Sequence, residues 1–156
     1  FQENIINNKS TKITINQKAI SDKSGSMDFI RVLGNTTGSH LAGAKEDPYG
    51  ELETFSVETA DINTVLLNND FVKMDIEGQE ATAILSTKKD TWANVEMILE
   101  VGTEKNAEII FEYLNKINVN MFSQKTGWNK VSNLAEVPTS YKEGSLFLSV
   151  ADKMSW

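Results

Sequence analysis

The chain of 156 residues contains no cysteine, only two prolines and a single histidine. Without cysteine, disulfide bonds, metal sites with thiolate ligands and cysteine nucleophiles are all excluded. The absence of cysteine also suits a reducing compartment, and the first residues show no basic and apolar export segment, so we expect a cytoplasmic protein. No apolar run approaches the roughly 20 residues that span a bilayer, which predicts that no membrane is a partner.

Basic residues are also too few to balance the acidic ones. The chain has 15 Lys and Arg against 22 Asp and Glu, which gives a formal net charge of −7. Nucleic-acid affinity comes largely from Lys and Arg that neutralise phosphates, and the lysines here are scattered along the chain. We therefore expect no nucleic-acid partner and favour a small or neutral substrate.

The N-terminal half reads as strands around one long loop. Residues 12–20 and 27–33 alternate apolar and polar side chains on either side of a turn, which predicts a hairpin. Residues 34–50 are rich in Gly, Thr, Ser and Asn and predict a long loop of the kind that is often functional. A third strand is expected at 52–58, followed by a short helix at 61–67.

From residue 70 onward strands and helices alternate. The expected order is a strand at 70–76, a helix at 77–85, a strand at 95–101, a helix at 104–117 and an antiparallel strand pair at 119–123 and 145–151. Such alternation predicts an α/β fold with a mostly parallel sheet covered by helices. Sheets of this kind bind their ligands beyond the carboxyl ends of the strands.

The segment KMDIEGQE (73–80) places acidic side chains where such a sheet binds its ligand. The apolar strand carries Asp75 to its carboxyl end, Gly78 permits a tight turn, and Glu77 and Glu80 lie together in the first helical turn. A purely structural reading stays open, because helix caps favour Asp and the helix dipole stabilises acids in the first turn by about 0.3–1 kcal/mol each.

The same segment resembles the K-x-D-x-E-G-x-E signature of FkbM-type methyltransferases. Other segments resemble the family in order and spacing: NIINN (4–8), KAISDKSG (18–25), VETADI (57–62) and ILEV (98–101). The resemblance covers nearly all of residues 3–101 and is most specific around 73–80.

The resemblance implies a Rossmann-like class I methyltransferase sheet that is incomplete here. The family's first two strands and its glycine-rich cofactor loop have no counterpart, because the glycines of residues 34–43 follow the wrong kind of strand. We therefore expect residues 1–156 to form a single partial methyltransferase domain, with the cofactor-holding segment missing upstream. Such a fragment should be inactive alone, and its exposed sheet edge should favour a homodimer.

By resemblance, the function is S-adenosylmethionine-dependent O-methylation of a hydroxyl on a sugar, a glycan or a small metabolite. Ala19, Ile20 and Ser21 would flank the adenine of S-adenosyl-L-methionine. Asp75 would face both the methyl donor and the acceptor hydroxyl, and Asp75 or Glu77 would take the hydroxyl proton.

Four further interpretations stay open. His40, the only histidine, lies in the predicted loop and is either a second base or an exposed bystander. Asp75, Glu80 and Glu100 offer oxygen ligands that would suit a divalent cation such as Mg²⁺, Mn²⁺ or Ca²⁺. The chain is alternatively a non-catalytic or degenerate fragment of such a domain, or a carboxylate-metal hydrolase that uses Asp75, Glu77 and Glu80.

Overall fold

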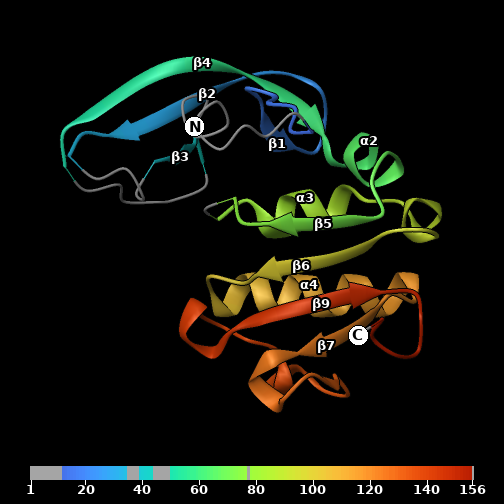
Figure 1. Ribbon diagram of the computed structural model, residues 1–156. Coiled ribbons are helices and arrows are strands. Elements are labelled where there is room, and N and C mark those ends of the chain that lie inside the picture. The colour runs from blue at the N-terminus through green and yellow to red at the C-terminus, as the bar shows by residue number, and fades with distance from the viewer. Residues whose placement is uncertain (1–11, 35–38, 44–49, 77, 156) are drawn as a thin grey trace.

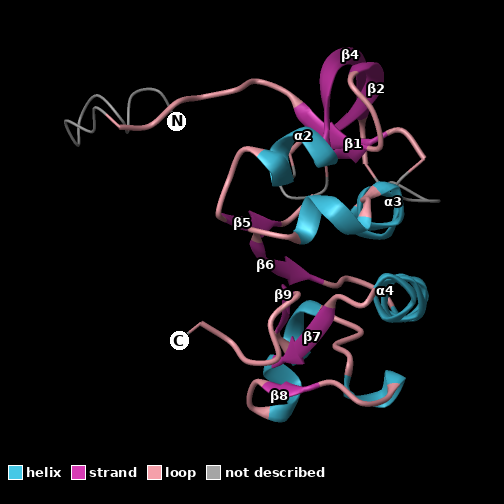
Figure 2. Cartoon of the chain, turned by 90° about the vertical axis from the view of Figure 1, so that its right-hand side faces the viewer, coloured by secondary structure: helices cyan, strands magenta, loops and turns pink. Residues whose placement is uncertain are grey.

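The computed structural model describes residues 12–34, 39–43, 50–76 and 78–155. These residues form a mixed α/β structure with two β-sheets and three α-helices. The two sheets follow one another along the chain, the N-terminal sheet at the top of Figure 1 and the C-terminal sheet at the bottom. Figure 2 shows α3 and α4 on one side of the C-terminal sheet. Residues 4–8, one of the segments that resemble the family, lie outside the described residues.

The first sheet has the strand order β1-β4-β2-β3. Its strands are β1 (Ala19–Ser21), β2 (Gly25–Val32), β3 (His40–Leu41) and β4 (Leu52–Asp61). β1 pairs with β4 in parallel, and β2 pairs with β4 in antiparallel fashion along its whole length.

The predicted hairpin between residues 12–20 and 27–33 is wrong, because β4 lies between β1 and β2. The physical reason is that side chains of β2 and β4 make favourable contacts across the two strands. Phe29 and Phe55 face each other with ring centroids 5.5 Å apart, and the Arg31 guanidinium lies 5.1 Å from the Phe55 ring. Cross-strand aromatic and cation–π contacts of this kind stabilise a sheet.

The second sheet has the strand order β5-β6-β9-β7-β8. Its strands are β5 (Phe71–Met74), β6 (Glu96–Glu100), β7 (Asn120–Ser123), β8 (Asn129–Lys130) and β9 (Ser145–Ser149). β5 and β6 are parallel, and β9 lies antiparallel between β6 and β7, which confirms the predicted C-terminal antiparallel pair. β5 is an edge strand of this sheet, and Phe71 is 47% exposed.

Side-chain caps and apolar stripes account for the helices. They are α2 (Ile62–Leu67), α3 (Glu80–Ser86) and α4 (Glu104–Ile117), with short 3-10 turns at Lys89–Trp92, Gln124–Thr126, Leu134–Glu136 and Tyr141–Glu143. Asp61 and Thr103 cap α2 and α4 by accepting backbone N–H bonds from the first turns. In the described part of the chain, no helix is both long and apolar enough to cross a membrane.

The main core lies between the second sheet and the helices. Its fully buried members include Met97, Leu99, Ile110, Leu114 and Leu148. Trp92 is also fully buried, and its indole N–H donates to Thr87 Oγ1 at 3.0 Å. This core fixes β5 and β6 in register, and their carboxyl ends are therefore held at one edge of the sheet.

Candidate functional site

Two predicted acidic residues lie at the carboxyl ends of neighbouring parallel strands. Asp75 directly follows β5, and Glu100 is the last residue of β6. The Lys73 ammonium lies between them, with Nζ 3.6 Å from Asp75 Oδ2 and 3.3 Å from Glu100 Oε1. The Asp75 side chain is 49% exposed, so a ligand at this edge can reach its carboxylate.

The two carboxylates raise the pKa of Lys73 above its ordinary value. The hydrogen bond to Glu100 contributes most, partial desolvation opposes it, and the charges of Glu100 and Asp75 add to the increase. Lys73 therefore remains a cation at neutral pH and compensates one of the two negative charges.

Asp75 lines a pocket of about 270 Å³ that also contains Ala19, Ile20 and His40. These residues come from β1, β3 and the turn after β5, so the fold brings together segments that are far apart in the sequence. Ser21 does not line this pocket; it is buried at the end of β1, and its hydroxyl donates to Asp22 Oδ1 at 3.0 Å.

His40 lies in a strand and not in the loop that we predicted. His40 pairs with Ile30 of β2, and the residue is only 1% exposed. The short pairing of β3 with β2 turns His40 inward. The alternative of an exposed bystander is therefore wrong, although a role as a base stays a prediction.

Glu80 closes the turn between β5 and α3. Its Oε1 accepts the backbone N–H groups of Ile76 at 3.3 Å and Gly78 at 3.0 Å, and its Oε2 accepts Asn106 Nδ2 at 3.2 Å. Glu80 is 3% exposed, and Gly78 has a φ of 101°, a conformation that favours glycine. Glu80 therefore stabilises the turn that positions Asp75. Glu77 lies outside the described residues.

The metal site that we considered for Asp75, Glu80 and Glu100 is not assembled. Among the residues that the structure describes, no group of three or more His, Asp or Glu side chains could hold a metal ion. The physical reason is visible at each carboxylate: Lys73 lies between Asp75 and Glu100, and both oxygens of Glu80 accept hydrogen bonds.

Sequence reasoning missed part of the pocket lining and the role of Lys73. Phe29 and Leu41 complete the apolar wall, and neither could be placed without knowing that β2 and β3 pair. Lys73 did carry a usable signal, because residues two apart on a strand point to the same face and Lys73 precedes Asp75 by two.

The comparison with protein families matches the part of the chain that forms this site. Residues 2–131 match the family model described as Methyltransferase FkbM domain. No curated protein and no solved structure matched the chain. The family match covers well over half of the chain and includes β1, β3 and the β5–α3 turn. On this evidence the chain belongs to the FkbM methyltransferase domain family.

Proposed function

We propose that this chain contributes the catalytic edge of an S-adenosylmethionine-dependent O-methyltransferase, with transfer at the pocket that Asp75 lines. One observation carries the proposal: a carboxylate at the end of a parallel strand shares a pocket with Ala19, Ile20 and His40. Family membership supplies the reaction class. The position of Asp75 in the pocket lining supports it as the residue that accepts the proton.

The lining of the pocket suits part of the cofactor. Ile20, Phe29 and Leu41 offer apolar surface for a flat nucleoside, and the Asp75 carboxylate suits a positively charged sulfur. The volume of about 270 Å³ is slightly below the roughly 300–1,000 Å³ of small-molecule sites. We infer that the pocket holds only part of the cofactor.

The remainder of the cofactor site belongs, in this proposal, between β1 and β5. β1 is the edge strand of one sheet and β5 is the edge strand of the other. The resemblance to class I methyltransferases places two further strands and the glycine-rich loop between the counterparts of these edges. An edge that offers unpaired backbone groups is well suited to receive such strands, or a second copy of the chain.

The cofactor, when bound, supplies a methyl group carried on a cationic sulfur. The residues of the chain hold the acceptor hydroxyl in line, exclude water and accept its proton. The Asp75 carboxylate would take the proton as the O–H bond breaks. The O–CH₃ bond would form as the methyl–sulfur bond breaks, with its electron pair left on the sulfur of the departing neutral thioether. Lys73 holds Asp75 in place at 3.6 Å, and His40 lines the same pocket as the second candidate for this proton.

The acceptor is a hydroxyl of a sugar, a glycan or another small metabolite. The net charge of −7 supports an uncharged acceptor over a phosphorylated one, since anions are repelled by an acidic surface. The Asp75 carboxylate at the pocket favours the same choice.

Tritium transfer from S-[methyl-³H]adenosylmethionine tests the proposal. The assay uses the complete product of the coding sequence that contains residues 1–156, with a set of mono- and oligosaccharides as acceptors. Asp75→Asn is compared with Asp70→Asn, which changes an acid at the opposite end of the same strand. Transfer that depends on Asp75 supports the enzyme. If neither the wild type nor Asp70→Asn transfers tritium to any acceptor, the result supports the non-catalytic alternative.

A further inference from the structure

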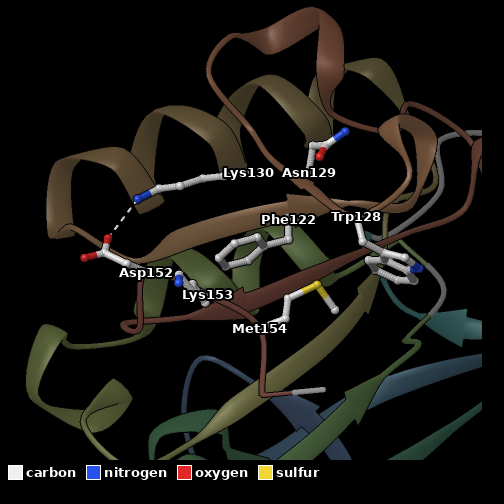
Figure 3. A pocket seen from close by; sticks show the side chains of 7 residues that line it. All are labelled: Phe122, Trp128, Asn129, Lys130, Asp152, Lys153 and Met154. Carbon is white, nitrogen blue, oxygen red and sulfur yellow. Dashed lines mark hydrogen bonds and ion pairs between the residues drawn. The ribbon is translucent and has the colours of Figure 1, made fainter.

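A second pocket lies on the C-terminal part of the chain. It has a volume of about 530 Å³ and is lined by Phe122, Trp128, Met154 and polar residues, none of which lines the Asp75 pocket. Figure 3 shows Phe122 as the floor, with Trp128 at one end and the segment of Asp152 at the other. The volume lies within the roughly 300–1,000 Å³ of small-molecule sites.

The Trp128 wall is built at a conformational cost. Trp128 has a φ of 65°, a left-handed conformation that is rare for a bulky residue, and its backbone N–H donates to Ser123 O at 2.7 Å. A turn of this shape accepts glycine or asparagine more easily. The turn therefore does not require a tryptophan at position 128. Strained backbone conformations of this kind are found at ligand sites.

The opposite wall is fixed by three contacts of the segment that follows β9. Asn120 Nδ2 donates to Ala151 O at 2.8 Å, Lys130 Nζ pairs with Asp152 Oδ1 at 3.0 Å, and Ser155 Oγ donates to Glu96 Oε2 at 2.6 Å. This segment lies beyond residues 2–131, which match the family, and on the side of the sheet opposite α4 (Figure 2). These three contacts therefore hold this wall of the pocket in its position.

The lining combines aromatic surface with hydrogen-bonding groups at its rim. The face of an indole carries partial negative charge and attracts C–H groups. Asn129 Nδ2 donates to Thr126 O at 2.6 Å, which orients the amide so that its oxygen can accept a hydroxyl. Asp152 supplies a second acceptor at the other end. A ligand that needs both an apolar C–H face and several hydroxyl contacts is a sugar ring.

We propose that this pocket binds a saccharide, stacked on Trp128 with its hydroxyls on Asn129 and Asp152. The site is separate from the proposed methyl-transfer pocket and needs no cofactor. Absence of sugar binding at this pocket would not contradict the methyltransferase proposal. Absence of methyl transfer would not contradict the saccharide proposal.

Indole N–H resonances of the ¹⁵N-labelled chain test the proposal with maltotriose, cellotriose and chitotriose as probes. We expect at least one of them to shift the Trp128 resonance in a saturable way. The Trp92 indole is an internal control, because it is fully buried and bonded to Thr87, and it should not move. Trp128→Gly removes this signal, so isothermal titration calorimetry measures its sugar binding beside the wild type. The variant should bind at least tenfold more weakly, while an unchanged Trp92 resonance shows that it is folded.

Asp152→Asn is the second variant, since its side chain is 90% exposed and the change leaves the packing intact. We expect it to weaken binding severalfold. The proposal is overturned if none of the three sugars gives a saturable shift at about 10 mM. It is also overturned if folded Trp128→Gly binds as tightly as the wild type, or if Trp128→Gly unfolds and Asp152→Asn binds as the wild type does.

Discussion

Lys73 Nζ lies 3.3 Å from Glu100 Oε1, and this contact joins the carboxyl ends of two parallel strands beside Asp75. The hydrogen bond to Glu100 is the largest cause of the raised pKa of Lys73. Glu100→Gln should therefore lower the pKa of Lys73 toward its ordinary value of 10.5. A pH titration of the Lys73 ε-carbon signal measures the change, and Glu108→Gln on the exposed face of α4 is the control.

The sign of the linked stability effect follows from the direction of that shift. A lysine whose pKa is raised by folding stabilises the folded state below its ordinary pKa, and the contribution disappears as the pH rises through the raised value. The Lys73 side chain is 58% exposed, so water and salt screen the effect and it should be small. A Lys73 pKa that stays unchanged in Glu100→Gln would contradict the contact.

Glu80 is expected to matter for stability. Glu80 is 3% exposed, and Glu80→Ala removes the acceptor of two backbone N–H groups and of Asn106 Nδ2. Loss of a charged acceptor of this kind costs about 1.5–3 kcal/mol in the free energy of unfolding. Urea denaturation measures it, with the exposed Glu108→Ala as the control within about 0.5 kcal/mol. Equal stability of the two variants would contradict a structural role for Glu80.

Gly144 is expected to tolerate no side chain. It has a φ of 99°, and a Cβ at this position would lie 2.5 Å from Gln124 Oε1, the atom that accepts the backbone N–H of Ser145. Gly144→Ala should lower the free energy of unfolding by about 1–3 kcal/mol. Gly102→Ala is the matched control, because a Cβ there meets nothing within 4 Å, and it should be neutral or stabilising by up to about 1 kcal/mol. Urea denaturation measures both variants. A lower unfolding midpoint for Gly102→Ala than for Gly144→Ala would show that the turn before β9 has a different structure.

The local elements could be read from the sequence because their signals are local. α4 covers residues 104–117 as predicted, since Thr103 caps it and Ile110 and Leu114 form its buried stripe. The change from strand to helix periodicity placed Asp75 at the end of a strand, where the structure has it. These signals depend only on neighbouring residues and on the helical or strand period.

The long-range relationships could not be read in the same way. An alternating strand does not specify its partner, and β2 pairs with β4 across the intervening loop instead of with the nearer segment. The strand at His40 could not be predicted, because two residues are too few to show an alternating pattern. The count of acids could not reveal that Lys73 lies between Asp75 and Glu100, because that position depends on the register of two strands.

Binding of S-adenosylmethionine by residues 1–156 alone should be weak. The Asp75 pocket has a volume of about 270 Å³, and in the described part of the chain β1 and β5 are edge strands of two separate sheets. We expect a Kd above about 0.1 mM by isothermal titration calorimetry. A micromolar Kd would mean that these residues already form a complete cofactor site.

Asp75 is proposed to accept the proton of the acceptor hydroxyl during methyl transfer. The most direct measurement is the initial rate of tritium transfer from S-[methyl-³H]adenosylmethionine by the complete gene product, with Asp75→Asn and Asp70→Asn side by side. We predict at least a hundredfold loss for Asp75→Asn, within the range of a general base, an unchanged melting temperature, and a rate within about twofold of wild type for Asp70→Asn. A wild-type rate in Asp75→Asn would show that Asp75 is not the base.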